Sequence, residues 1–133
     1  RVIETQPFTR AAKKVLTDED RRALTEHVAQ FRELGTIIPD TGGLRKLRWS
    51  SGQRGKRGGS RVVYYYMDDE APLYLLTVYR KAAQEDMTYA EKKAARKFVA
   101  ALKKTLKDPA RRRAHLRLID CEGTVGTVVK VSR

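Results

Sequence analysis

The sequence predicts an α+β domain, in which helices pack against a small antiparallel β-sheet. Two observations indicate this class. Apolar residues recur at helical spacing over residues 8–34 and 88–106, whereas residues 44–49, 60–67 and 73–79 carry strand-like runs with β-branched and aromatic residues. The predicted order is strand, helix, helix, three strands and a helix, which is typical of helices covering one sheet.

An N-terminal helical hairpin is expected after a short opening strand at residues 2–5. Residues 8–16 carry apolar side chains at a helical spacing. Thr17 is expected to cap the second helix, because the three acidic residues after it favour the positive end of a helix dipole. We expect this helix to end near Leu34, with Gly35 as its C-cap.

Three consecutive strands are predicted in the middle of the chain. Residues 44–49 alternate imperfectly between apolar and basic side chains, and residues 60–67 are rich in Val and Tyr. Residues 73–79 are apolar enough to form a central strand. Thr88 and Glu91 then have the spacing of a capping box, which predicts the start of a C-terminal helix that packs on the sheet.

The end of the chain differs from the rest. Pro109 is expected to stop or interrupt the C-terminal helix. The predicted domain therefore covers residues 1–107, and residues 108–133 form a C-terminal extension. Two alternatives stay open for this extension: poor order, or a short hairpin of residues 116–120 and 124–131.

The composition restricts the partners of the chain. Its 133 residues include 29 Lys and Arg against 16 Asp and Glu, a formal net charge of +13. Such a charge favours nucleic acid as a partner, ahead of an acidic protein or an anionic membrane. The sequence has no run of about 20 apolar residues, so we expect no membrane segment.

No metal or cofactor is expected. Cys121 is the only cysteine, which excludes an intrachain disulfide and a cysteine metal cluster, and fits a reducing, cytoplasmic location. The acidic residues are scattered or bunched at helix starts and turns, so no carboxylate cage is evident. His27 and His115 are expected on the surface and apart from each other.

The densest positive charge lies in residues 42–66. This segment carries no acidic residue, and its seven basic residues are Arg45, Lys46, Arg48, Arg54, Lys56, Arg57 and Arg61. Cations on strands and on the loop between them suit a phosphate backbone. Trp49 and the three tyrosines of residues 64–66 could stack on bases, although we expect most of them to lie in the core or on the sheet.

The segments GGLRKLRWSSGQRGKRGGSRVVYYY and LYLLTVYRKAAQEDMTYAEKKAARKFV resemble the RelE/HigB superfamily of bacterial toxins, and most closely its HigB-like branch. The resemblance covers residues 1 to about 107. It implies a sheet with a helical hairpin and a C-terminal helix. It also implies the toxin of a type II toxin–antitoxin system, a ribosome-dependent mRNA endonuclease. Such a toxin is neutralised by an antitoxin from the neighbouring gene, here expected to carry a helix-turn-helix.

The resemblance implies roles for individual residues. Arg61 occupies the position of a phosphate-binding arginine, and Lys56 lies in the loop where the family has basic residues. We expect Lys56 to act as base or charge stabiliser, and Arg61 with Arg80 to clamp the transition state. Tyr89 is a candidate general acid. The cations expected to position RNA are Arg45, Lys46, Arg48, Arg54, Arg57 and Lys81.

Two further interpretations stay open at this stage. The chain could be a non-catalytic RNA- or DNA-binding module that uses the same basic strands. It could also act mainly as an interaction protein for an acidic or helical antitoxin, which is compatible with catalysis.

Overall fold

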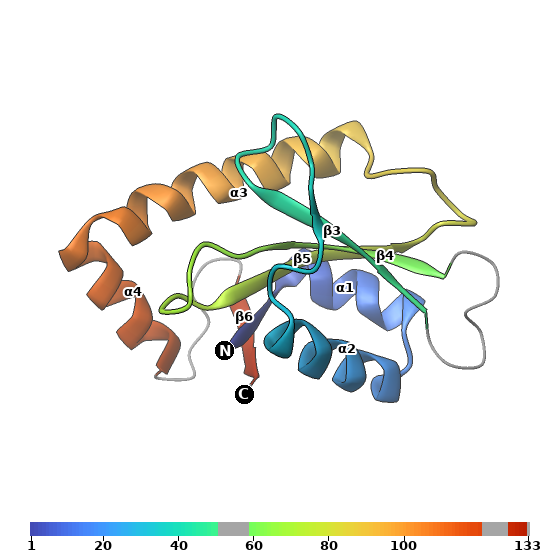
Figure 1. The fold of residues 1–133 in the computed structure, drawn as a ribbon, viewed down its shortest axis with the longest axis horizontal. Coiled ribbons are helices and arrows are strands. Elements are labelled where there is room, and N and C mark those ends of the chain that lie inside the picture. Colours follow the sequence, from blue (N-terminus) through green and yellow to red (C-terminus); the bar gives the residue numbers. More distant parts are fainter. Residues whose placement is uncertain (51–58, 121–127, 133) are drawn as a thin grey trace.

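The computed structural model describes residues 1–50, 59–120 and 128–132, and Figure 1 shows their arrangement. In this part of the chain six strands form one sheet, in the order β2-β3-β4-β5-β1-β6. The elements in chain order are β1 (Val2–Thr5), α1 (Gln6–Val15), α2 (Asp18–Gln30), β2 (Thr36–Ile37), β3 (Leu44–Trp49), β4 (Ser60–Tyr65), β5 (Leu73–Arg80), α3 (Tyr89–Lys107), α4 (Pro109–Asp120) and β6 (Val128–Ser132). The predicted α+β class is confirmed.

The sheet is mixed, whereas an antiparallel sheet was expected from the sequence. Strands β2 to β5 are antiparallel neighbours, but β1 lies parallel to β5, with Val2 opposite Leu73. Some 70 residues separate these two strands, so no tight turn fixes their relative direction. The Thr5 hydroxyl reinforces the pairing by donating a hydrogen bond to the carbonyl of Leu75, at 2.9 Å.

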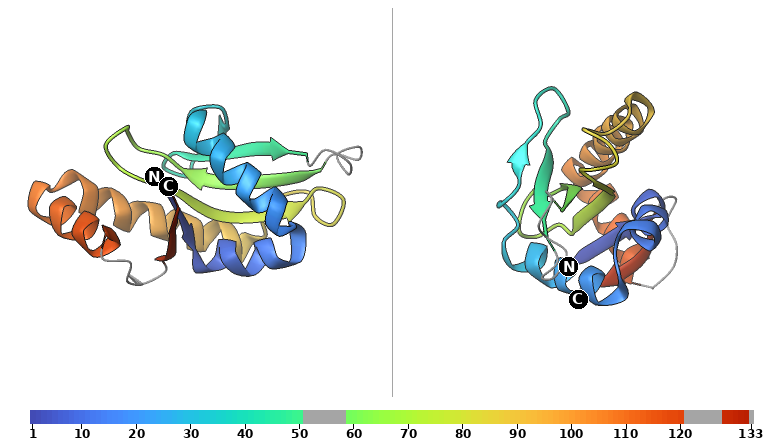
Figure 2. Two further views of the ribbon diagram at one scale, coloured as in Figure 1. Left: turned by 90° about the horizontal axis from the view of Figure 1, so that it is seen from below. Right: turned by 90° about the vertical axis from the view of Figure 1, so that its right-hand side faces the viewer.

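Helices cover both faces of the sheet (Figure 2). On one face, the apolar side chains of α1 and α2 pack with Val62, Tyr64 and Val78 of the central strands. On the other face, α3 packs with Val63, Tyr65 and neighbouring residues. The residues that the helices bury in these two clusters are Phe8, Ala12, Leu24 and Val28 on the first face, and Ala95, Val99, Leu102 and Leu106 on the second. This double burial explains the nearly continuous apolar run of β5.

Helix α2 ends at Gln30, earlier than expected. Its beginning is as predicted, because the Thr17 hydroxyl accepts a hydrogen bond from the Asp20 N–H at 3.0 Å. Beyond Gln30 the buried Tyr64 hydroxyl competes with the helix. It donates to the carbonyl of Arg32 and accepts from the N–H of Gly35, both at 2.8 Å. The core therefore fixes the connection to β2 in a non-helical path.

A buried ion pair joins α2 to the sheet. The Glu4 side chain on β1 is 1% exposed, and Arg21 donates to both of its carboxylate oxygens. Breaking such a pair by removing one partner leaves an uncompensated buried charge, which is strongly destabilising. This pair therefore fixes the position of α2 over β1.

The first part of the C-terminal extension is helical. One of the two alternatives had expected residues 116–120 to form a strand of a short hairpin. Residues 116–120 form the end of α4, and β6 pairs with β1 instead of with them. Asp108 ends α3 and also caps α4, since its carboxylate accepts a hydrogen bond from the Arg111 N–H at 2.9 Å. Pro109 is tolerated at the first position of α4, because no helical bond requires its missing N–H.

Helix α4 packs against the rest of the fold through apolar, hydrogen-bond and ion-pair contacts. Ile119 is 1% exposed within the core on the α3 side. The Tyr74 hydroxyl lies 2.8 Å from Nε2 of His115, and Arg112 pairs with Asp68 at 3.0 Å. His115 is partly buried and contacts Tyr74, so it is not the freely solvated residue that was expected. A domain boundary at residue 107 stays a prediction, and these contacts provide its test.

We predict that Ile119→Ala lowers the free energy of unfolding by about 2–4 kcal/mol, because it leaves a cavity in the shared core. The matched control is Leu118→Ala, since the Leu118 side chain is 53% exposed and its truncation is expected to change stability by about 0.5 kcal/mol or less. Urea unfolding measures both values. Two equally small effects would mean that the extension is dispensable and that the domain ends at residue 107.

The Tyr74–His115 contact predicts that α4 docking weakens in acid. Burial lowers the pKa of His115 below its ordinary value of 6.5, so the folded state favours the neutral imidazole. The neutral imidazole therefore makes its full contribution to the free energy of unfolding above pH 6.5. This stabilisation is lost as the pH falls through the pKa of His115 in the folded state. Unfolding at pH 7.5 and at about pH 5 should therefore show a larger loss for the wild type than for His115→Gln. Equal losses would contradict the prediction.

Candidate functional site

A row of side chains crosses the sheet on the face that α3 covers. Arg48 of β3 lies directly opposite Arg61 of β4, which in turn lies opposite Tyr79 of β5. Directly opposed residues of neighbouring strands project from the same face. Lys46 lies two residues before Arg48 on β3 and shares this face. We call Lys46, Arg48, Arg61 and Tyr79 the cross-strand row.

The sheet holds like charges together in this row. Two cations directly opposite each other on neighbouring strands destabilise a sheet. A glycine keeps the strands close at this end, because Gly59 has φ +55° and a Cβ there would lie 2.4 Å from the Trp49 carbonyl oxygen. An anion bound between Arg48 and Arg61 would relieve their repulsion, and paired guanidinium groups suit phosphate oxygens.

Asp86 lies beside the row, in the connection between β5 and α3. Its carboxylate is 3.8 Å from the Lys46 ammonium and 4.0 Å from the Lys92 ammonium. Burial alone would raise the pKa of Asp86. The Met87 N–H and the two ammonium groups outweigh burial and hold that pKa below its ordinary value. Asp86 is therefore a carboxylate at neutral pH, and it links a sheet cation to a cation of α3.

Tyr79 is a buried member of the row. Burial, and then the neighbouring Asp86 carboxylate, raise the pKa of Tyr79 to about 12. The hydroxyl therefore keeps its proton at neutral pH, and it donates to an Asp86 carboxylate oxygen at 3.3 Å. This contact orients Asp86 toward the cations. Tyr79 and Asp86 were missed by the sequence analysis, because only the strand register places Tyr79 opposite Arg61.

The structure does not bring Arg61 and Arg80 together. Arg80 follows Tyr79 on β5, so its side chain projects from the opposite face of the sheet. It is exposed and lines a groove with Lys14 and Trp49. A joint clamp of Arg61 and Arg80 therefore has no support from their placement.

Arg45 also lies on the opposite face from the row. Its guanidinium donates to the carbonyls of Glu33 at 3.1 Å and Gly35 at 2.9 Å, which holds the connection before β2. This position gives Arg45 a structural contact in addition to any contact with RNA. Lys81 lies beyond the end of β5, where its ammonium pairs with Glu85 at 2.8 Å.

Tyr89 is placed at the start of α3 and is 82% exposed. It lies close in sequence to Asp86, and its phenol is accessible to a ligand. Three other predicted site residues, Arg54, Lys56 and Arg57, lie outside the described residues. Their predicted roles stay predictions.

Most aromatic residues of the basic segment belong to the core, as expected. Tyr64 and Tyr65 are 0% and 3% exposed. Trp49 is partly buried, and its ring centroid lies 5.4 Å from that of His27. The expectation that His27 is a solvated residue away from the basic strands was therefore wrong.

Within residues 1–50, 59–120 and 128–132, no group of three or more His, Cys, Asp or Glu side chains is placed to hold a metal ion. In the same part of the chain, none of the helices combines the length and the apolar character needed to cross a membrane.

Comparison with known protein families supports the resemblance to RelE toxins. The family described as "RelE toxin of RelE / RelB toxin-antitoxin system" matches residues 1–114. Among solved structures, a double mutant of the E. coli toxin RelE in the free state is similar, at 17% sequence identity and a TM-score of 0.43. That match covers 63% of this chain and 85% of the other. The family match spans most of the sequence, and the chain therefore belongs to the RelE toxin family of toxin–antitoxin systems.

Proposed function

We propose that this toxin is a ribosome-dependent endonuclease that cleaves mRNA without a metal ion and so inhibits translation. The observation that carries the proposal is the cross-strand row, in which Arg48 and Arg61 project from one face of the sheet. The ionised Asp86 and Lys46 lie beside them. A cationic row next to a carboxylate suits a scissile phosphate and its developing charge.

The chemistry requires three tasks. The 2′-hydroxyl must lose its proton as its oxygen attacks the adjacent phosphorus, the extra negative charge must be stabilised, and the departing 5′-oxygen must gain a proton. We assign charge stabilisation to Arg61 and Arg48, whose guanidinium groups keep their charge. Lys56 remains the proposed base or second charge stabiliser, and Tyr89 the proposed acid. Tyr79 is a positioning residue, because it acts through Asp86.

The cognate partner of a toxin in this family is an antitoxin protein. We propose that it is encoded by the neighbouring gene, carries a helix-turn-helix, and acts on this toxin in the cytoplasm. Membership of the HigB-like branch is part of the same proposal. The competing function is a non-catalytic RNA- or DNA-binding module, since the cationic row would bind phosphates whether or not it cleaves them.

We predict that Arg61→Ala lowers the rate of mRNA cleavage by about 10²-fold or more, as expected for loss of one transition-state contact. Arg80→Ala is the matched control, because it removes an arginine from the opposite face of the sheet, on the neighbouring strand β5. We expect it to have a smaller effect. Ribosome cleavage assays and thermal melts of both variants provide the comparison. If both variants fold and lose cleavage rate equally, Arg61 and Arg80 act together on the transition state after all.

We predict that cleavage requires the ribosome and no divalent metal in the protein's own site. A site built from Arg and Lys has weak proton acceptors, so it should act slowly on free RNA. An mRNA held by the ribosome would be oriented for attack, and orientation can contribute several kcal/mol. The measurement compares one mRNA with and without ribosomes, using toxin treated with chelator and then freed of it. Fast cleavage of naked RNA would contradict the ribosome requirement. Activity restored only by added metal would contradict the metal-free mechanism, and binding without cleavage would support the module.

A further inference from the structure

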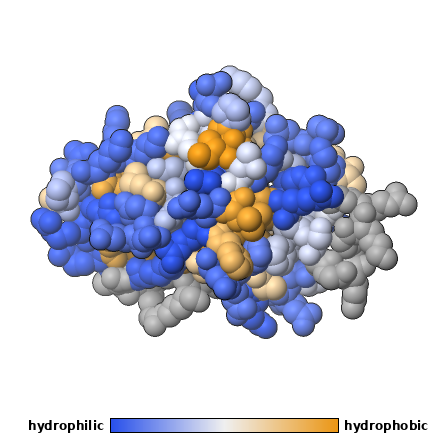
Figure 3. All heavy atoms as spheres, viewed as in Figure 1, coloured by the Kyte–Doolittle hydropathy of each residue, from blue (hydrophilic) through white to orange (hydrophobic). Residues whose placement is uncertain are grey.

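Helix α3 carries a second concentration of positive charge that lies outside the basic segment. Its 19 residues include one acid, Glu91, and seven cations: Lys92, Lys93, Arg96, Lys97, Lys103, Lys104 and Lys107. A bland explanation is a solvated helix face, with the last cations favourable at the negative end of the helix dipole. Figure 3 shows that hydrophilic residues dominate the face of the molecule seen there, with a smaller hydrophobic area near its middle.

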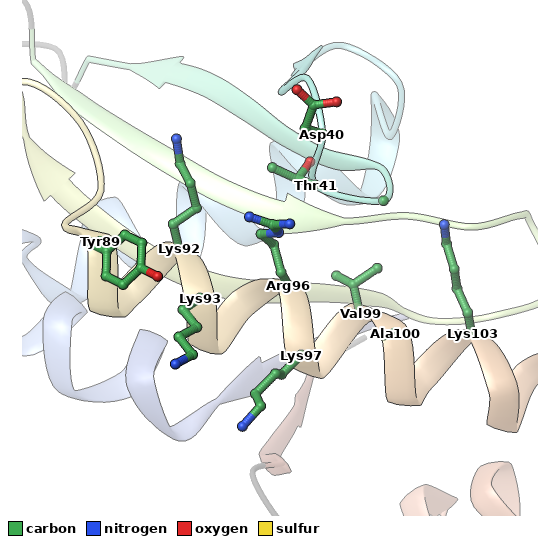
Figure 4. A pocket seen from close by; sticks show the side chains of 11 residues that line it. Asp40, Thr41, Tyr89, Lys92, Lys93, Arg96, Lys97, Val99, Ala100 and Lys103 are labelled. Atoms are coloured by element: carbon green, nitrogen blue, oxygen red, sulfur yellow. The ribbon is translucent and has the colours of Figure 1, made fainter.

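The orientation of these side chains distinguishes two groups (Figure 4). Lys92, Arg96 and Lys103 point from α3 toward the turn before β3, and with that turn they line a cleft of about 560 Å³. Lys93 and Lys97 are also among the lining residues, although their side chains point to the other side of the helix in Figure 4. Lys104 and Lys107 of the same helix are exposed and do not line the cleft. Helical geometry places residues 92, 96 and 103 on one face of α3. The turn that packs on this face makes a cleft whose charged lining consists of five cations, Lys92, Lys93, Arg96, Lys97 and Lys103, and one acid, Asp40.

The turn that forms the opposite wall is closely fitted to α3. Gly42 has φ +82°, and a Cβ there would lie 3.3 Å from Val99 Cγ1 and 3.4 Å from Lys103 Nζ. The Thr41 hydroxyl fixes the turn by donating to the Ile38 carbonyl at 2.6 Å. The Asp40 carboxylate lies on the far side of the turn from the helix. Asp40 is nevertheless a lining residue, so the wall consists of backbone, the small Thr41 side chain and Asp40.

The cleft continues into the candidate site. Asp86 lies within 4.0 Å of both Lys46, in the cross-strand row, and Lys92, at the near end of the cleft. Arg96 lies four residues after Lys92, and Lys103 lies eleven residues after Lys92. The three cations therefore extend along about 17 Å of the helix axis. Tyr89 lines the same end as Lys92 and offers an exposed aromatic ring. Cations in series with an aromatic ring are the usual means of holding a single strand.

We propose that this cleft, lined by Lys92, Arg96 and Lys103, binds the RNA strand as it continues away from the scissile phosphate. The inference rests on the proposed function, because it assumes that the cross-strand row receives RNA. It adds a second contact region, which lies between α3 and the turn at residues 40–43. The cleft takes phosphates of the backbone and reads no bases, since its cations contact phosphate oxygens.

The experiment measures binding of RNA oligonucleotides that cannot be cleaved because they carry 2′-O-methyl groups. One oligonucleotide has four nucleotides and fits only the cross-strand row, and the other has twelve and also reaches the cleft. Three folded proteins are compared: the wild type, Arg96→Gln with Lys103→Gln, and the matched control Lys104→Gln with Lys107→Gln, whose two lysines are exposed on α3 and do not line the cleft. Both double variants remove two cations from the same helix, so they alter net charge equally.

We expect the wild type to bind the longer RNA more tightly. The variant at Arg96 and Lys103 should lose this advantage and keep its affinity for the short RNA. Its plot of log affinity against log salt for the longer RNA should be shallower by about 1.4, because each lost phosphate contact removes about 0.7. The control at Lys104 and Lys107 should behave nearly as the wild type.

Several results would overturn the inference. Equal losses in the two double variants would mean that general charge, not the cleft, holds RNA. Loss of binding to purified antitoxin with RNA binding unchanged would assign the cleft to an acidic protein partner. If the toxin cleaves mRNA normally on ribosomes but binds the short and the long RNA equally well, the cleft does not bind RNA and the proposed endonuclease function still holds. If the toxin binds the longer RNA more tightly but does not cleave mRNA, the cleft binds RNA and the proposed endonuclease function is wrong.

Discussion

The structure depends on the burial of β4 and β5 on both faces. Val62, Val63, Leu75 and Val78 are each 2% exposed or less, so helices must cover both sides of this strand pair. Hydrophobic burial is the largest favourable contribution to folding, and here it fixes α1 and α2 on one face and α3 on the other. The ends of the strands that the helices do not cover are then available for charged residues.

This arrangement explains how one sheet serves both the core and the site. Along β4 the side chains alternate between the two cores, and Arg61 is the member of the α3-side series that lies at the end of the strand. Pairing in register with β3 and β5 places Arg48 and Tyr79 beside it. The connection from β5 to α3 then supplies Asp86, whose carboxylate offsets part of the local positive charge. The strand register therefore builds the candidate site from residues that are distant in sequence.

The extension after α3 has a different role from the site. Asp108 and Pro109 end one helix and begin the next, and α4 contributes Ile119 to the core. Strand β6 covers β1, which would otherwise form the edge of the sheet. An uncovered edge presents unpaired backbone groups that favour association with other chains. The extension therefore protects the fold at the side away from the cross-strand row.

Local patterns in the sequence determined the class of the fold, the three central strands, the cap at Thr17 and the capping box at Thr88. These features depend on residues within a few positions of one another. The dense positive charge of residues 42–66 is likewise visible in one short stretch of sequence. The sequence also carried the family resemblance. Tertiary structure alone decided the parallel pairing of β1 with β5, the early end of α2 and the helical form of residues 109–120. It also decided which cations share a face: strand alternation and register separate Arg45 and Arg80 from Arg48 and Arg61, and packing of α3 against the turn at Gly42 forms the cleft. Such choices arise from contacts between distant segments, whose energies no short stretch of sequence contains.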